Sequence, residues 1–361
     1  MSPTSLPSNR STGRPGIALA CLLGALALGA LSPEPTRGGS RVERQLGMMG
    51  TALTVSVEHE DRRQALLSSE AAVVELERVE SRLSTWRETS ELSRLNRAPV
   101  GERVSLTPEL HGELTRAREF WELTDGAFDP TVGSTLRAWA IREGGQLPTP
   151  SERSAAVVTA SFDSLRLSEH AEASAPQPWA ERLAENLRLE EGGFGKGIGL
   201  DRAKAALLAS GAHSARLDLG GQVLVYGRTE EILLADPRDR SVALLSVSLS
   251  SGSIATSGNS ERSVEIEGQR VSHIFHPRTG EPVADFGSLT VIASDAFTAD
   301  ALSTGLYVLG PKRALELVHT LDGVELIILD TRNSTLHATL TEGLRGRVTL
   351  LDPAIEVAWA F

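Results

Sequence analysis

The chain has 361 residues, enough for one large domain or two modest ones with a substantial core. Its formal net charge is -11 and its lysines and arginines form no long run, so we expect no nucleic acid partner. Aromatic residues make up only 4% of the chain, so the core must rest mainly on aliphatic side chains.

The N-terminus has the pattern of an export signal. Arg10 and Arg14 precede an apolar run at 17–31, which ends before small residues and a proline. This order predicts a secretory signal peptide over residues 1–32, with a retained membrane anchor as the alternative. The single cysteine, Cys21, lies inside the apolar run, so lipidation is the weaker interpretation. A cleaved chain would have no disulfide, thiol catalysis or cysteine metal site.

The rest of the chain alternates between strand and helix patterns. Residues 33–45 are rich in Pro, Gly, Ser and Arg and predict a linker before a domain over 46–361. The sequence favours strands at 51–58, 214–219, 222–226, 230–235, 242–250, 288–294, 324–329 and 347–351, and helices at 62–83, 107–124, 200–210, 297–309 and 312–320. Residues 147–180 look irregular. We therefore predict a mixed α/β or α+β unit.

The most informative stretch for chemistry is 272–304. Asp300 and Thr304 are four residues apart, which places both oxygens on one helix face. A carboxylate with a hydroxyl suits a hard cation such as Mg²⁺. His273, beside a turn signal, could move a proton. Taken singly, the histidine could be structural and the Asp/Thr pair could belong to a helix cap region.

Each of two further segments could contact a ligand or could be only an ordinary turn. The run 192–197 combines glycines with Lys196 ahead of a helix, an arrangement that offers N–H groups and a positive charge to an anion. It matches neither nucleotide-binding fingerprint and could be only a tight turn. Asp129 lies in the run 126–133 before a proline, where an Asp-Pro pair often just starts a turn.

In their order along the chain, these motifs resemble the ApbE family, the FAD:protein FMN transferases. The resemblance extends from Met49 to the C-terminus. The matching pieces are Met49-Gly50-Thr51, 84–96, 126–133, 193–201, Leu219-Gly220-Gly221, Ala255-Thr256-Ser257-Gly258, 272–280 and 299–304.

The resemblance implies a function and a fold. Family members bind FAD and Mg²⁺, split the pyrophosphate and attach FMN through a phosphoester to a threonine or serine of a target protein, with AMP leaving. The acceptor could be a subunit of a membrane redox complex. An FAD pyrophosphatase and a non-catalytic flavin-binding protein are the alternatives. The implied fold has two similar α+β halves with the FAD site between them, and the implied location is the periplasm or the periplasmic face of the inner membrane.

The resemblance also implies roles for particular residues. His273 would be the base that takes the proton of the incoming hydroxyl. The metal ligands would be Asp300, Thr304 and the Gly193 carbonyl, with Ser303 as an added contact. The positions lining the FAD site would be Met49, Trp86, Ala127, Phe128, Asp129, Glu190, Lys196 and Phe275. Trp86 is the aromatic expected to contact a ring.

The chain departs from the family pattern at several positions. Glu190-Glu191 stands where Asp-Leu is common, and His276 stands where an aspartate usually precedes the proline. Gln222 replaces an aspartate after two glycines, and Ser260 replaces a common aromatic. These changes leave room for altered flavin affinity, altered target choice or a tilt toward hydrolysis.

Overall fold

The computed structural model describes residues 39–158, 161–169, 177–259, 263–332 and 335–361. The predicted signal peptide or anchor at 1–32 lies outside these ranges, as does Ser260. Within the described ranges, none of the helices combines the length and the apolar composition that a bilayer crossing requires.

A nine-stranded sheet organises the described part of the chain. All its neighbouring strands are antiparallel except the last pair, which is parallel. In spatial order its strands are β1 (Ser40–Met48), β2 (Thr51–His59), β6 (Ser214–Leu219), β7 (Gln222–Tyr226), β10 (Gly252–Gly258), β13 (Gly287–Ala293), β14 (Glu325–Arg332), β15 (Thr335–Thr341) and β17 (Glu356–Ala360).

Smaller sheets and helices surround this sheet. The short strands are β3 (Arg103–Ser105), β5 (Trp179–Arg182) and β4 (Leu165–Leu167) in one sheet, β16 (Val348–Leu350), β9 (Ala243–Leu249) and β8 (Glu230–Ala235) in a second, and β11 (Ser263–Ile266) with β12 (Gln269–Ser272) in a third. The helices are α1 (Arg62–Leu83), α2 (Glu91–Arg97), α3 (Pro108–Leu123), α4 (Gly133–Ala138), α5 (Pro150–Val157), α6 (Gly195–Ala209) and α7 (Ala296–Val318), with the 3₁₀ turn η1 (Ile141–Glu143).

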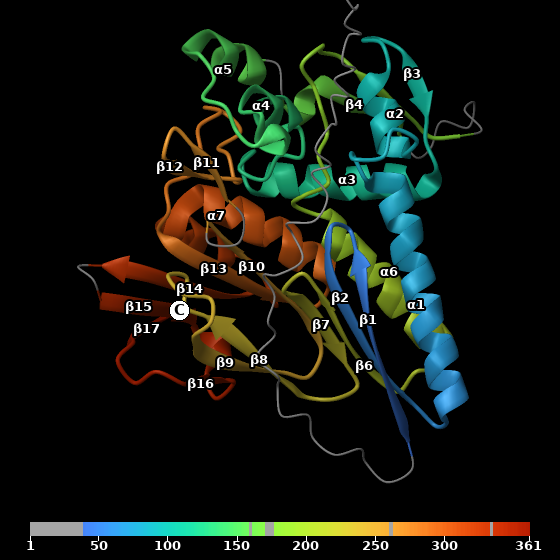
Figure 1. The fold of residues 1–361 in the computed structure, drawn as a ribbon, viewed down its shortest axis with the longest axis vertical. Helices are drawn as coiled ribbons and strands as arrows, with labels where there is room; N and C mark the ends of the chain where they lie inside the picture. The colour runs from blue at the N-terminus through green and yellow to red at the C-terminus, as the bar shows by residue number, and fades with distance from the viewer. Residues whose placement is uncertain (1–38, 159–160, 170–176, 260–262, 333–334) are drawn as a thin grey trace, which may run out of the picture.

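Three helices, α1, α6 and α7, cover one face of the large sheet. In Figure 1, α1 and α6 lie side by side next to β1, β2 and β6, whereas α7 crosses β10 and β13. Helices α2 to α5, with β3 and β4, form the upper part of the view. This arrangement brings the N-terminal ends of α6 and α7 into contact near the middle of the molecule.

Successive side chains of a strand point to opposite faces of the sheet. Along the central strands, apolar side chains therefore pack on both faces. On β7, Leu224 packs with α1 and α6, while Val223 and Val225 pack on the opposite face with the sheet of β8, β9 and β16. On β13, Leu289 packs under α7 and Ile292 on the opposite face. Each fully buried aliphatic side chain of this kind contributes about 1.5–3 kcal/mol, so the sheet is a rigid support for α6 and α7.

The prediction of a mixed α/β fold is confirmed, whereas the similarity of two halves stays a prediction. The linker prediction is wrong for residues 40–45, because β1 begins at Ser40 and pairs along its length with β2. Residues 40–45 have a polar, basic composition because β1 is an edge strand with few buried side chains. That composition did not indicate a strand. Within the supposedly irregular 147–180 segment, α5 begins with a capping box between Thr149 and Glu152.

Candidate functional site

The site lies where the N-terminal ends of α6 and α7 meet. At Gly197, a Cβ atom would lie 2.4 Å from the Ala296 carbonyl oxygen, so a side chain there would force the helices apart. Helix α6 begins at Gly195, five residues before the predicted start, and therefore includes Lys196 in its first turn. Glycine at position 197 thus allows the close approach that brings Lys196 to α7.

Asp300 on α7 is held by the first turn of α6. Its carboxylate accepts hydrogen bonds from Lys196 Nζ at 2.8 Å and from the Gly197 backbone N–H at 2.9 Å. The Asp300 residue is only 3% exposed. A buried carboxylate needs such partners, and the positive end of α6 adds to their stabilisation. The predicted metal ligand Asp300 and Lys196, which is predicted to line the FAD site, are therefore direct neighbours.

Asp201 on α6 makes the converse contact with α7. Its carboxylate accepts from the backbone N–H groups of Ala296 at 2.8 Å and Phe297 at 3.0 Å. Burial raises the pKa of Asp201 above its ordinary value, although these two hydrogen bonds oppose the rise. The two helices are therefore fixed to each other by a carboxylate from each.

The other predicted metal ligands adjoin Asp300. A Cβ atom on Gly193 would lie 3.3 Å from Thr304 Oγ1, so the Gly193 backbone passes close to this hydroxyl. Ser303 points elsewhere: its Oγ donates to the Asp300 carbonyl at 2.9 Å and accepts from Ser257 Oγ at 3.0 Å. The structure thus places Ser303 in the packing between α7 and β10, which supports the helix that carries Asp300.

The donor set fits a small hard cation. Carboxylate, hydroxyl and carbonyl oxygens are the ligands that Mg²⁺ takes, and the Lys196 ammonium already lies against the Asp300 carboxylate as a positive group. Among the described residues, no group of three or more His, Cys, Asp or Glu side chains could hold a metal. A bound cation would therefore take further ligands from water and substrate phosphates, as Mg²⁺ commonly does.

The segment 126–133 forms a wall of this site. Phe128 is buried, meets Phe194 edge-on and lies beside Gly193. Asp129 accepts from Trp121 Nε1 at 3.1 Å and from the Thr131 hydroxyl at 2.6 Å. Burial raises the pKa of Asp129 to about 6 despite these bonds. The side chain of Asp129 is thus bound within its own loop, while Phe128 lies next to the proposed metal ligands.

His273 lies half-buried on the connection between β12 and β13. Its neighbour Ser272 holds this connection, because the Ser272 hydroxyl donates to Asn259 Oδ1 and accepts from the Ile274 backbone N–H at 2.9 Å. Asn259 follows the end of β10, the strand whose Ser257 contacts α7. A chain of polar contacts therefore links the backbone around His273 to the helix that carries Asp300.

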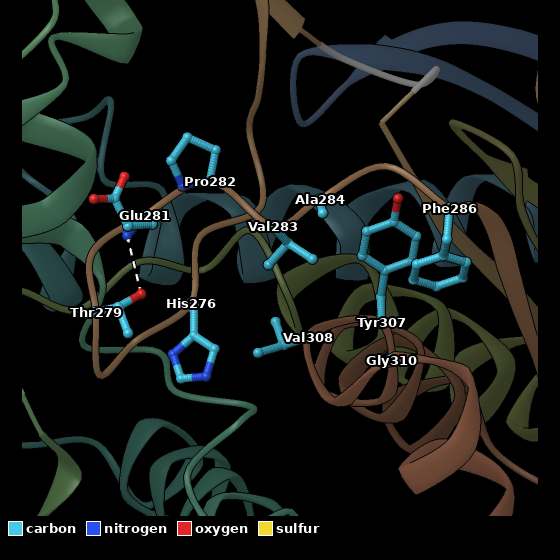
Figure 2. Close-up of a pocket in the computed structure, with 10 residues that line it drawn as sticks. All are labelled: His276, Thr279, Glu281, Pro282, Val283, Ala284, Phe286, Tyr307, Val308 and Gly310. Carbon is cyan, nitrogen blue, oxygen red and sulfur yellow. Dashed lines mark hydrogen bonds between the residues drawn. The ribbon is translucent and has the colours of Figure 1, made fainter.

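The same connection borders a surface cavity of about 360 Å³. Figure 2 shows its lining, with the His276 imidazole at one end and the stacked rings of Phe286 and Tyr307, 4.4 Å apart, at the other. Burial and the neighbouring Arg278 lower the pKa of His276 below its ordinary value. The His276 departure therefore places an imidazole, rather than a carboxylate, beside this cavity.

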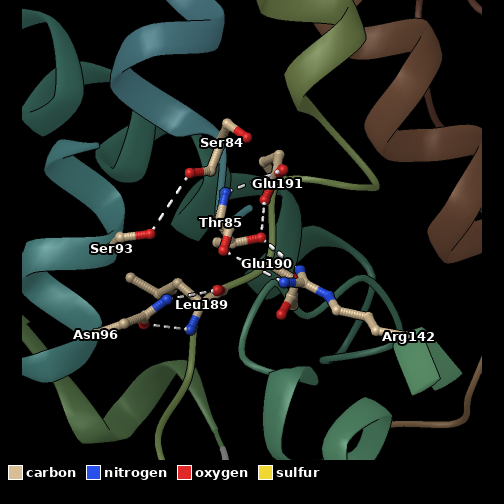
Figure 3. Close-up of polar contacts among 8 residues, drawn as sticks. All are labelled: Ser84, Thr85, Ser93, Asn96, Arg142, Leu189, Glu190 and Glu191. Atoms are coloured by element: carbon tan, nitrogen blue, oxygen red, sulfur yellow. Dashed lines mark hydrogen bonds and ion pairs between the residues drawn. The ribbon is translucent and has the colours of Figure 1, made fainter. Parts of the chain in front are cut away.

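A second polar cluster lies next to the 190–193 segment. Trp86 is 70% exposed, and the Arg142 guanidinium lies 4.3 Å from the centre of its ring. Figure 3 shows Arg142 reaching Glu190 and Thr85, with Glu191 on the other side of Thr85. Burial raises the pKa of Glu190, and Arg142 opposes this rise.

The remaining predicted FAD positions are divided. Met49 lies in the β1–β2 turn, where its side chain faces Gly199 of α6. Ala127 is buried beside Phe128. Phe275 instead packs against Trp139, 5.4 Å away, in a separate apolar cluster. The structure therefore brings together Lys196, Asp300, Thr304, Gly193 and Phe128, but it does not place the Phe275 ring among them.

Sequence reasoning missed some residues that the structure places at the site. Arg142 gave no signal, because its partners Thr85 and Glu190 are 57 and 48 residues away along the chain. Asp201 and Ser257 lay inside matched motifs, but without any assigned contact. The available indication was a glycine close by in sequence, at Gly199 for Asp201 and at Gly258 for Ser257.

Together, the fold and site define a mixed α/β protein in which a buried aspartate and a lysine meet at paired helix N-termini. The model of the ApbE family matches residues 49–328. The chain belongs to the ApbE family, and this prediction from the sequence is confirmed.

Curated relatives carry the name FAD:protein FMN transferase. The chain is 28% identical to that of Haemophilus influenzae over 302 residues, which cover 79% of this chain and 85% of the relative. It is 30% identical to that of Treponema pallidum over 296 residues, covering 77% and 80%. The ApbE protein of Thermotoga maritima superimposes with a TM-score of 0.75 at 28% identity, over 85% of this chain and 99% of that one. The flavin transferase ApbE from Vibrio cholerae, at 23% identity and a TM-score of 0.74, shares the fold over 86% of this chain and 99% of its own.

Proposed function

We propose that this ApbE-family member is a FAD:protein FMN transferase. It would take FAD and an acceptor protein as substrates and release AMP. The observation that carries the proposal is the contact of Asp300 with the first turn of α6, within a family whose curated relatives bear this name.

The site must first neutralise the negative charge of the pyrophosphate. Lys196 and the N-terminal N–H groups of α6 offer positive charge to phosphate oxygens. Asp300, Thr304 and the Gly193 carbonyl would hold Mg²⁺, which when bound neutralises phosphate charge and polarises the bond that breaks. Asp300 fixes the lysine and the helix end in place for this task.

Bond formation needs an oxygen nucleophile. The acceptor threonine or serine oxygen would attack the FMN-side phosphorus as the bond to the AMP oxygen breaks. His273 would take the hydroxyl proton on an imidazole nitrogen, since its ordinary pKa lies near neutrality. If water replaced the acceptor, the same step would give FMN and AMP, which is the pyrophosphatase alternative.

The FAD ring system would lie against Trp86, whose exposed side chain offers an open aromatic face. Phe128 lies beside Gly193, one of the proposed metal ligands. Met49, Ala127, Asp129 and Glu190 stay candidates for the walls of the nucleotide site. A non-catalytic flavin-binding protein would use the same walls without needing His273.

The proposed location of the protein rests on its N-terminal sequence. We propose that residues 1–32 direct export and that the domain acts in the periplasm or on the periplasmic face of the inner membrane, with an exported acceptor such as a subunit of a membrane redox complex. Fractionation of cells expressing the full chain would test this, and recovery in the cytoplasmic fraction would contradict it.

The chemical proposal is tested by chromatography of FAD incubated with the protein and Mg²⁺, with and without EDTA. We expect AMP to form in an acceptor-dependent reaction that EDTA stops. AMP formation without any acceptor would favour the pyrophosphatase. FAD binding without AMP in the presence of an exported acceptor would favour the binding protein.

A further inference from the structure

The Trp86 side chain is held in place although it is not part of the core. Its side chain is 70% exposed, so it contributes little to the core. Yet one face of the indole lies under the Arg142 guanidinium, 4.3 Å from the ring centre. A cation over the face of an indole is attracted to the ring and favours one orientation of its plane. The ring is therefore oriented while its other face is left open.

Arg142 is itself held in place by its backbone. It lies in the 3₁₀ turn η1, which begins after Ala140 in the left-handed conformation at φ 46°. The Ala140 carbonyl accepts from the N–H of Gly145 at 2.8 Å, and Trp139 Nε1 donates to the Gly280 carbonyl at 2.8 Å. Arg142 thus extends from a fixed turn.

The guanidinium also pairs with the Glu190 carboxylate and donates to the Thr85 hydroxyl. Arg142 Nη2 donates to Glu190 Oε2 at 2.5 Å and to Thr85 Oγ1 at 2.6 Å. The Thr85 hydroxyl has one proton to donate, and both Glu191 at 2.6 Å and Glu190 at 3.0 Å lie within reach of it. Since the hydroxyl can satisfy only one of them, Glu190 depends on Arg142 (Figure 3).

These contacts join two parts of the site. Glu190 and Glu191 lead directly into Gly193, and the Glu191 carbonyl accepts from the N–H groups of Phe194 and Gly195 at the start of α6. Thr85 immediately precedes Trp86. In this cluster, Arg142 is therefore the side chain that contacts both the Trp86 ring and Glu190, in the segment that leads into Gly193 and α6.

We propose that Arg142 is a positioning residue for FAD: it orients the open face of Trp86 for a planar ring and ties that face, through Glu190, to the loop that meets the pyrophosphate. This inference rests on the proposed function. It deepens that function by naming the side chain that sets the spacing between the ring and phosphate subsites. Lysine could pair with Glu190, but it lacks the planar group that stacks and donates in two directions.

The test is calorimetric titration of FAD in EDTA, so that binding is measured without turnover. We expect Arg142→Ala to weaken FAD binding about tenfold, which corresponds to ~1.4 kcal/mol. Arg142→Lys should recover less than half of this loss. In steady-state turnover, Arg142→Ala should raise the KM for FAD while kcat stays within about twofold. Its melting temperature should stay close to that of the wild type.

A matched control and a second variant make the test specific. Arg345 stacks on Trp359 at 4.4 Å and pairs with Glu342, the same chemistry at the C-terminal end of the fold, so Arg345→Ala should leave FAD binding unchanged. In a Trp86→Ala background, Arg142→Ala should weaken binding little further, because the ring it orients is gone.

Three results would overturn the inference while leaving the proposed function intact. The first is wild-type affinity in Arg142→Ala, and the second is full additivity of the Arg142 and Trp86 substitutions. The third is full recovery by Arg142→Lys, because charge alone would then suffice. By contrast, a wild-type protein that binds no FAD would overturn the proposed function itself.

Discussion

Asp201 and Asp300 cap each other's helices. Asp201, on α6, accepts from the first backbone N–H groups of α7, and Asp300, on α7, accepts from the Gly197 N–H of α6. Each carboxylate satisfies donors that a helix start leaves unpaired. Because Asp300 is also a proposed metal ligand, the same contact that joins the helices fixes the geometry of the site.

The Asp201 cap should be worth a measurable amount of stability. Asp201→Asn removes the negative charge and leaves one oxygen to accept from two N–H groups, so we expect the free energy of unfolding to fall by ~1–3 kcal/mol. Urea denaturation measures this change. The exposed Asp322 is the matched control, and Asp322→Asn should change stability by less than ~0.5 kcal/mol. Equal effects of the two substitutions would contradict the capping role.

Asp300 should be essential for metal-dependent turnover. Asp300→Ala removes the only carboxylate in the proposed ligand set and leaves Lys196 without its partner. We expect AMP release to fall at least ~100-fold, since a metal supplies several kcal/mol of charge stabilisation. Activity should be followed across a Mg²⁺ titration, with Asp322→Ala as the control. Unchanged Mg²⁺ dependence in Asp300→Ala would contradict the ligand assignment.

Gly193 offers a steric test of the same centre. In Gly193→Ala, the new methyl would lie 3.3 Å from Thr304 Oγ1 and force a small displacement of that hydroxyl. We expect turnover to fall about tenfold or more, because small misplacements at a reacting centre are costly. The adjacent Gly192 is the control, since a Cβ there meets nothing within 4 Å. Similar rates for Gly192→Ala and Gly193→Ala would count against the site.

Asp129 should make stability depend on pH. Burial raises its pKa from 3.8 to about 6, so the folded state binds its proton more tightly than the unfolded state does. This contribution is fully present below about pH 4 and is lost as the pH rises through about 6. We therefore expect the stability of the wild type relative to Asp129→Asn to fall by ~1–3 kcal/mol between pH 4 and pH 7. A pH-independent difference between the two proteins would contradict the raised pKa.

His273 should affect transfer more than binding. His273→Ala should keep the wild-type FAD affinity, measured in EDTA, and lose about 10²- to 10⁴-fold in transfer rate, the range typical of a lost general base. His337, paired with Glu356 at the edge of the large sheet, is the control position for His337→Gln. An unaltered transfer rate and pH profile in His273→Ala would show that His273 is not the general base.

Much of the fold could be predicted from hydrophobic periodicity. The strand at 214–219 and the helix at 62–83 match β6 and α1, because both have strong periods and clear boundaries. The break predicted between the helices at 297–309 and 312–320 appears as a kink in α7, where Gly310 has φ 77° ahead of Pro311. Strand β10 was missed because its glycine and small polar residues have the composition of a loop, although it lies in the middle of the sheet.

The candidate site could be predicted only in part. Asp300 and Thr304 share a helix face by spacing alone, but their meeting with Lys196 depends on the α6–α7 crossing at Gly197. The Arg142 contacts depend on a turn whose sequence gives no periodic signal. Long-range contacts of this kind are set by tertiary packing, which local sequence patterns do not encode.

The central claim is that this centre transfers FMN to a protein. The most direct measurement is the mass of a candidate exported acceptor after incubation with the protein, FAD and Mg²⁺, with AMP followed in the same samples. We predict that the acceptor gains the mass of FMN less water on one threonine or serine and that an equal amount of AMP appears. AMP formation with no change in the mass of any exported acceptor tested would contradict the claim.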